Sequence, residues 1–186
     1  MTMTKRIWSG IVMALCMALC TGCKPSQMQA AKASEEKEIG LKVQVLNYMD
    51  EGLGVVYVNG VWAGSMSSHA GGHSIAGAIG LPAKWHPGLT VEVEWRDNTL
   101  WEKDPNGLYK TQVQVEPYDI KYDGYLWLAF FPGNKVRALP SSTSPGFPGF
   151  PDGLKYPAVV CQADPACAAE FYPERAPHPS QDHKNG

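Results

Sequence analysis

The chain has 186 residues, of which 16 are Lys or Arg and 18 are Asp or Glu, and its formal net charge is −2. The basic residues are scattered, which excludes a nucleic-acid-binding surface of the usual kind, because such a surface needs clustered Lys and Arg to displace counterions. Once an N-terminal signal is removed, about 164 residues remain, enough for one domain with a hydrophobic core and too few for two of ordinary size.

Residues 1–22 have the features of a lipoprotein signal peptide. Two basic residues precede an apolar run over residues 7–19, which is too short to span a bilayer. Among the three cysteines of this region, Cys23 is the one that follows a small residue, Gly22, and a small residue is needed before the lipidated cysteine. We therefore predict cleavage after residue 22 and lipidation of Cys23. The alternative is a plain secretory signal that leaves Cys23 as a thiol.

The residues after Cys23 predict where the protein is attached. Lys24 stands where Asp usually retains bacterial lipoproteins in the inner membrane, so we expect a lipid anchor in the outer membrane, facing the periplasm. Residues 23–38 contain almost no large apolar side chains, and we interpret them as the lipidated cysteine and a flexible tether.

A folded domain is expected over residues 39–174. Apolar and polar residues alternate over 41–46, 91–95 and 113–115, as in half-buried strands, and residues 125–131 are apolar throughout, as in a strand covered on both faces. Asn59-Gly60 between two apolar runs predicts a two-residue hairpin. These patterns predict an all-β fold, a single-domain antiparallel β-sandwich of seven or eight strands.

The remaining segments are less regular. Four glycines fall within residues 71–80, typical of a loop whose backbone packs closely or bends, and residues 140–151 repeat Pro-Gly-Phe. Asp164-Pro165 is a capping pair before a short C-terminal helix, which is the single helix that we predict. The tail, residues 175–186, is predicted to be disordered. Cys161 and Cys167 are expected to form a disulfide in an oxidising periplasm.

No catalytic motif is recognisable, and we predict a protein that is not an enzyme and carries no cofactor. His69 and His73 are four residues apart, but the glycines around them oppose a helix and no third ligand is evident, so no metal site is predicted. A metal-binding protein remains an alternative if these histidines meet a third ligand in the fold.

Aromatic residues are the stronger functional signal. Trp and Tyr are enriched at binding hot spots, although they also build β cores. We assign Trp95 and Trp127 to the core. We predict a contact surface from the residues at strand ends and in loops, namely Trp62, Trp85, Trp101, His69 and His73.

Residues 81–95 read Leu-Pro-Ala-Lys-Trp-His-Pro-Gly-Leu-Thr-Val-Glu-Val-Glu-Trp and, with residues 115–118 and 126–136, resemble a bacterial lipoprotein family known as a domain of unknown function. The resemblance covers residues 41–139. Many members have adjacent cysteines where this chain has Gly77 and Ala78, so no role of that pair is carried over.

The resemblance implies a function by genetic context, because such lipoproteins are often encoded beside phospholipase effectors of type VI secretion, where they look like immunity proteins. We therefore expect this protein to bind and neutralise a cognate effector in the periplasm, while attached to the membrane by its lipid. Two alternatives stay open, a structural or accessory lipoprotein of a permanent envelope assembly and a small-ligand or metal-binding periplasmic protein.

Overall fold

The computed structural model describes residues 37–72, 75–121 and 123–174. The predicted signal peptide, the lipidation at Cys23, nearly all of the tether, His73 and the predicted disordered tail lie outside the described residues. The first strand begins at Glu38, inside the predicted tether. No helix among the described residues is long and apolar enough to cross a membrane.

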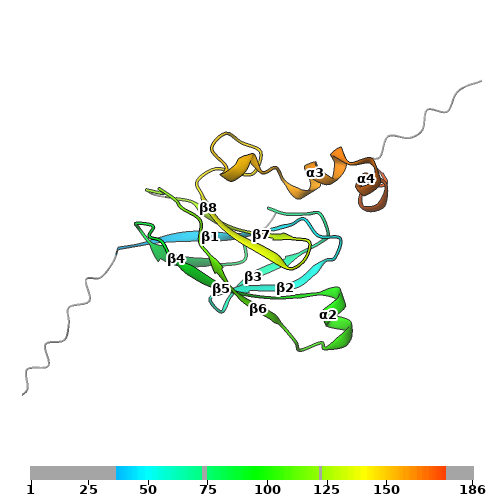
Figure 1. Cartoon of the computed structure of the whole chain (residues 1–186), viewed down its shortest axis with the longest axis horizontal. Helices are drawn as coiled ribbons and strands as arrows, with labels where there is room; N and C mark the ends of the chain where they lie inside the picture. Colours follow the sequence, from blue (N-terminus) through cyan, green and yellow to red (C-terminus); the bar gives the residue numbers. More distant parts are fainter. Residues whose placement is uncertain (1–36, 73–74, 122, 175–186) are drawn as a thin grey trace, which may run out of the picture. The chain divides into compact units, whose positions relative to one another are not determined.

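The described residues form two four-stranded sheets (Figure 1). In chain order the strands are β1 Glu38–Asn47, β2 Leu53–Val58, β3 Val61–Met66, β4 Ala78–Pro82, β5 Thr90–Asp97, β6 Tyr109–Gln114, β7 Tyr125–Phe131 and β8 Lys135–Ser141. Sheet A has the order β4-β1-β7-β8, and sheet B has the order β3-β2-β5-β6. The fold is therefore mostly β, as the sequence predicts.

One strand pair departs from the predicted antiparallel arrangement, because β1 and β7 are parallel. Parallel neighbours need a long connection. Here the chain leaves sheet A after β1, forms all of sheet B together with β4, and then returns to β7 in the original direction. All other strand pairs within the two sheets are antiparallel.

The main core lies between the two sheets. In β5, Val91, Val93 and Trp95 are buried, whereas the residues between them are partly exposed, so the predicted period of two is confirmed. Leu41, Val43 and Val45 of β1 belong to the same core.

A second core covers the other face of sheet A. Trp127 of β7 and Phe150 are buried there, with Leu154 and Tyr156 packed against them. The chain after β8 thus crosses sheet A and adds a third layer over it (Figure 1). This layer explains why β7 is apolar throughout, since both of its faces are covered.

One turn and one close approach between backbone segments depend on glycine. The β2–β3 turn has positive φ angles at Asn59 (47°) and Gly60 (74°), as the predicted two-residue hairpin requires. The two ends of the glycine-rich segment pair with β1, since Gly71 bridges to Leu46 and β4 pairs with the first half of β1. A Cβ at Gly71 would lie 2.8 Å from the Val45 carbonyl oxygen, so glycine is needed for this approach.

The predicted C-terminal helix is confirmed as α4 (Pro165–Phe171), with the Asp164 side chain accepting a hydrogen bond from the Ala166 amide. The prediction of a single helix is wrong, because α2 (Asn98–Lys103), α3 (Pro157–Ala163) and a 3-10 turn (Pro151–Gly153) also form. Each of these is at most seven residues long, too short to show a helical period. A disulfide joins Cys161 of α3 to Cys167 of α4.

Candidate functional site

Sheet B has one face toward the core and one that no described segment covers, in contrast to sheet A with its third layer. Because Val56 and Val58 of β2 are fully buried, Val55 and Tyr57 point to the opposite side. We call this side the open face and define it by Val55, Tyr57, Trp62, Glu94, Arg96 and Lys110, together with Trp101 of α2. Its tryptophans, Trp62 and Trp101, are each more than half exposed.

Strand register places an aromatic pair at one edge of the open face. Trp62 of β3 lies directly opposite Tyr57 of β2, and Tyr57 in turn lies opposite Glu94 of β5. The Trp62 residue is 52% exposed although it belongs to a strand. An exposed indole beside a half-buried phenol is a typical anchor of a protein interface.

A cation–π pair occupies the adjacent part of the face. The Arg96 guanidinium carbon lies 4.8 Å from the centre of the Trp101 ring, and Arg96 Nη1 also donates a hydrogen bond to the Pro105 carbonyl oxygen. Trp101 is 53% exposed. It is presented by α2, which begins where the Asp97 side chain accepts a hydrogen bond from the Leu100 amide.

The lysine on the far edge of the open face is already paired with carboxylates. Lys110 Nζ lies 2.8 Å from Glu92 Oε1 and 3.2 Å from Glu94 Oε1. Hydrogen bonds to these two carboxylates raise the pKa of Lys110. Such exposed ion pairs contribute little to stability, and they leave no unpaired cation among the described residues of this edge for a ligand.

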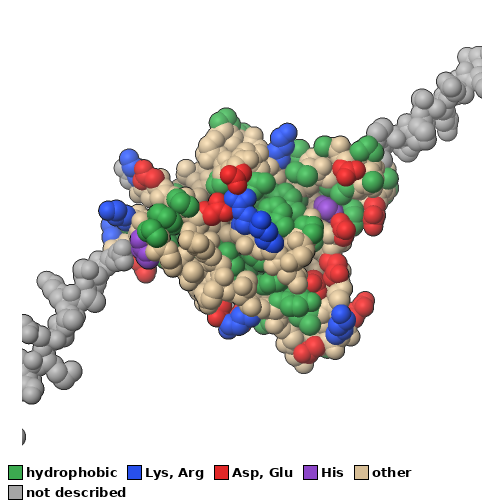
Figure 2. Space-filling view, viewed as in Figure 1, with side chains coloured by type: hydrophobic (Ala, Val, Ile, Leu, Met, Phe, Trp, Pro, Cys, Tyr) green, Lys and Arg blue, Asp and Glu red, His purple; other side chains and the backbone are tan. Residues whose placement is uncertain are grey.

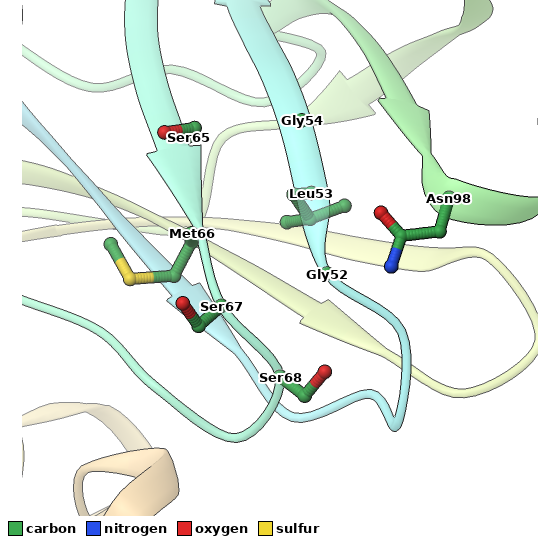
Figure 3. A pocket seen from close by; sticks show the side chains of 8 residues that line it. All are labelled: Gly52, Leu53, Gly54, Ser65, Met66, Ser67, Ser68 and Asn98. Carbon is green, nitrogen blue, oxygen red and sulfur yellow. The ribbon is translucent and has the colours of Figure 1, made fainter. Parts of the chain in front are cut away.

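A groove of about 580 Å³ continues the open face beyond Val55 (Figure 3). Its lining is polar and uncharged, with the exception of two apolar side chains, and consists of Gly52, Leu53, Gly54, Ser65, Met66, Ser67, Ser68 and Asn98. Gly54 is an extra residue in the pairing of β2 with both neighbours, because the register shifts between Leu53 and the residues that follow. This bulge leaves the backbone of Gly54 exposed in the groove.

The structure brings some predicted contact residues to this surface and separates others. Trp62 and Trp101 lie on the open face. Trp85 lies in the β4–β5 connection, half-buried, and its Nε1 donates to the Val115 carbonyl oxygen at 2.9 Å, so this indole fastens a loop. His73 falls outside the described residues.

His69 lies beside the C-terminal helices. Its side chain is 12% exposed, its Nε2 is 2.8 Å from Asp50 Oδ1, and its ring packs on Phe171 at 4.5 Å. This position offers little surface to a partner. His69, Cys161 and Cys167 form the one trio of potential metal ligands among the described residues, but the two sulfur atoms are bonded to each other. The trio therefore holds no metal while the disulfide is intact.

Tyr57 and Arg96 are members of the open face that we did not predict. The alternation of β2 and β5 predicts the face on which each lies. Tyr57 stands next to buried valines and Arg96 next to buried Trp95, so both side chains point away from the core. What alternation cannot give is the pairing of these strands or the position of α2 above Arg96.

Comparison with protein families matches residues 46–138 to the family described as "Protein of unknown function (DUF3304)". This chain belongs to that family. The matched region contains the whole open face and ends within β8, so the segment that covers sheet A lies beyond it. No curated protein and no solved structure matches the chain.

Proposed function

We propose that this DUF3304 protein is a lipid-anchored immunity protein, which binds a phospholipase-type effector of type VI secretion in the periplasm and neutralises it. The anchor is supported by the signal-like residues 1–22 and by Cys23 after Gly22. The partner class is supported by the resemblance of residues 81–95 and two further segments to lipoproteins of that kind. The open face supports binding as the activity.

The observation that carries the proposal is the difference between the two sheets. Sheet A is covered by the protein's own C-terminal segment, whereas the outer face of sheet B carries Trp62, Tyr57, Arg96 and Trp101 with no described covering. Trp, Tyr and Arg are the residue types most enriched at interface hot spots. A face of this composition on the DUF3304 region itself is what a protein-binding module needs.

The chemistry of the surface favours binding over catalysis. Lys110 is engaged by two glutamates, and the groove is lined by hydroxyl, amide and glycine groups and two apolar side chains, with no charged side chain among them. A general acid or base needs a titratable group directed at the substrate, and the groove lining offers none. An inhibitor needs only a stable complementary surface that blocks access to the effector's active site.

Attachment to the membrane suits this activity. A phospholipase attacks lipids at the surface to which the inhibitor is tethered, and tethering raises the local concentration of the inhibitor without any new contact. The segment between Cys23 and β1 keeps the inhibitor near that surface.

The test measures binding and residual lipase activity with the effector encoded beside the gene. Each of Trp62→Ala and Trp101→Ala should weaken binding by about 30-fold, since a hot-spot truncation typically costs about 2 kcal/mol, and the double variant by roughly several hundredfold or more. Phe147→Ala is the matched control, because Phe147 is 63% exposed but lies in the segment after β8 and not on the open face. Its affinity should equal that of the wild type.

Other outcomes assign the function differently. Tight binding without inhibition of the lipase would indicate an adaptor or carrier of the effector. Absence of binding to the effector would contradict the immunity function and favour an accessory role in the envelope.

A further inference from the structure

Within the part of the chain that the structure describes, Arg96 lacks the carboxylate partner that three other basic residues of the strands have. Lys42, Lys110 and Arg137 each lie within 4.0 Å of at least one carboxylate. Within residues 37–72, 75–121 and 123–174, Arg96 forms no ion pair. It is thus a cation of the open face whose charge no described carboxylate neutralises.

The guanidinium of Arg96 is nevertheless held in place. Trp101 covers one of its faces at 4.8 Å, and the Pro105 carbonyl oxygen accepts from Nη1. The other edge of the group, Nε and Nη2, has no acceptor among the described residues, and Nε is buried. An arginine fixed on an aromatic ring loses little rotamer freedom when a carboxylate approaches its free edge.

We propose that Arg96 and Trp101 form a receptor for a carboxylate of the partner, an Asp or Glu side chain of the bound effector. This inference rests on the proposed function and names the chemistry of the contact. The carboxylate accepts a charge-assisted hydrogen bond from Nη2, while the guanidinium keeps its place on the Trp101 ring. The adjacent groove at Gly54 has room for the backbone that carries this residue.

The charge around this receptor makes it selective. Figure 2 shows several acidic side chains, with a basic one among them, at the end of the folded unit that carries α2 and α4. A generally acidic protein is repelled by this surface, whereas a partner with one carboxylate in register with Arg96 is accepted. A fixed cation without a described carboxylate partner, close to these acidic side chains, thus orients the partner as well as adding affinity.

The first test compares three variants of the mature chain, each carrying Cys23→Ser for solubility, in binding to the effector. Arg96→Ala and Arg96→Lys should both weaken binding by about tenfold or more, because lysine keeps the charge but loses the planar fork and the stacking. Lys42→Ala is the control on sheet A, away from the open face. Its cation is paired with Asp123, so its loss should change affinity less than about threefold. Unchanged affinity of both Arg96 variants, in a wild type that binds, overturns the receptor and leaves the proposed function standing.

A second test does not depend on the effector. Sodium acetate is titrated against the same mature chain, with sodium chloride at equal ionic strength as the control, while the Arg96 Nε–H and Trp101 Nε1–H resonances are followed by NMR. Acetate should shift both resonances in a saturable manner that chloride does not reproduce, and Arg96→Lys should abolish the effect at Trp101. Equal shifts in the two salts overturn the inference, even if the effector does not bind at all.

Discussion

The third layer over sheet A predicts opposite fates for two phenylalanines in the same repeated Pro-Gly-Phe-Pro sequence. Phe150 is 4% exposed and meets Trp127 edge-on at 5.8 Å, whereas Phe147 is 63% exposed. Replacing a buried phenylalanine by alanine costs about 3–5 kcal/mol. Because the covering segment can settle partly into the space, we expect Phe150→Ala to lower the free energy of unfolding by about 3 kcal/mol, toward the lower end of that range.

A loss of about 3 kcal/mol is large enough to test whether the third layer packs on sheet A, since a domain has only about 5–15 kcal/mol of stability. Urea unfolding followed by tryptophan fluorescence measures it, and Phe147→Ala is the control with an expected change within about 0.5 kcal/mol. The near-ultraviolet circular dichroism of Phe150→Ala should also change, because Trp127 loses its aromatic neighbour. Equal stability of the two variants would refute the third layer.

Three further predictions concern local features. Gly60→Ala should destabilise the fold by about 1–2 kcal/mol because Gly60 has φ 74°, whereas Gly40→Ala, with open space at the Cβ position, should have little effect in the same thermal-unfolding assay. Replacing Cys161 and Cys167 by serine should cost about 2 kcal/mol in urea, the value expected for a short closed loop, and a reductant should reproduce this loss in the wild type and leave the variant unchanged. Burial raises the pKa of Tyr48 from 10.0 to about 12, so its contribution to stability is complete below pH 10 and is lost as the pH rises to 12. Tyr48→Phe should lack this component in unfolding measured across that range.

The sequence predicts the elements in which a single local preference, such as alternating burial or a turn-forming residue pair, determines the backbone. Alternation in β5 follows from one buried and one exposed face, and the Asn59-Gly60 turn follows from the positive φ angles that these two residues tolerate. β4 was missed because glycine and proline interrupt its five residues, and it is held by pairing with β1 rather than by its own propensity. Tertiary pairing overrides local preference in such short strands.

The candidate site is predictable only in part for a related reason. The exposure of Trp62 and Trp101 could be anticipated from their positions at strand ends and in loops. Their assembly with Arg96 depends on the register of β2 with β5 and on the short helix that follows Asp97, and neither has a period that one sequence reveals. The sequence predicts Trp85 to be a contact residue, but its indole donates a hydrogen bond to the Val115 carbonyl oxygen, which is distant in sequence, and so it holds a loop in place.

Oxidative footprinting of the complex with the effector tests the central claim most directly. Trp62, Trp101 and Phe147 are each more than half exposed in the free protein and should all be oxidised there. If the open face binds the effector, oxidation of Trp62 and Trp101 should fall strongly in the complex while that of Phe147 stays unchanged. Protection of Phe147 with undiminished oxidation of the two tryptophans would contradict the account and place the interface on the C-terminal segment.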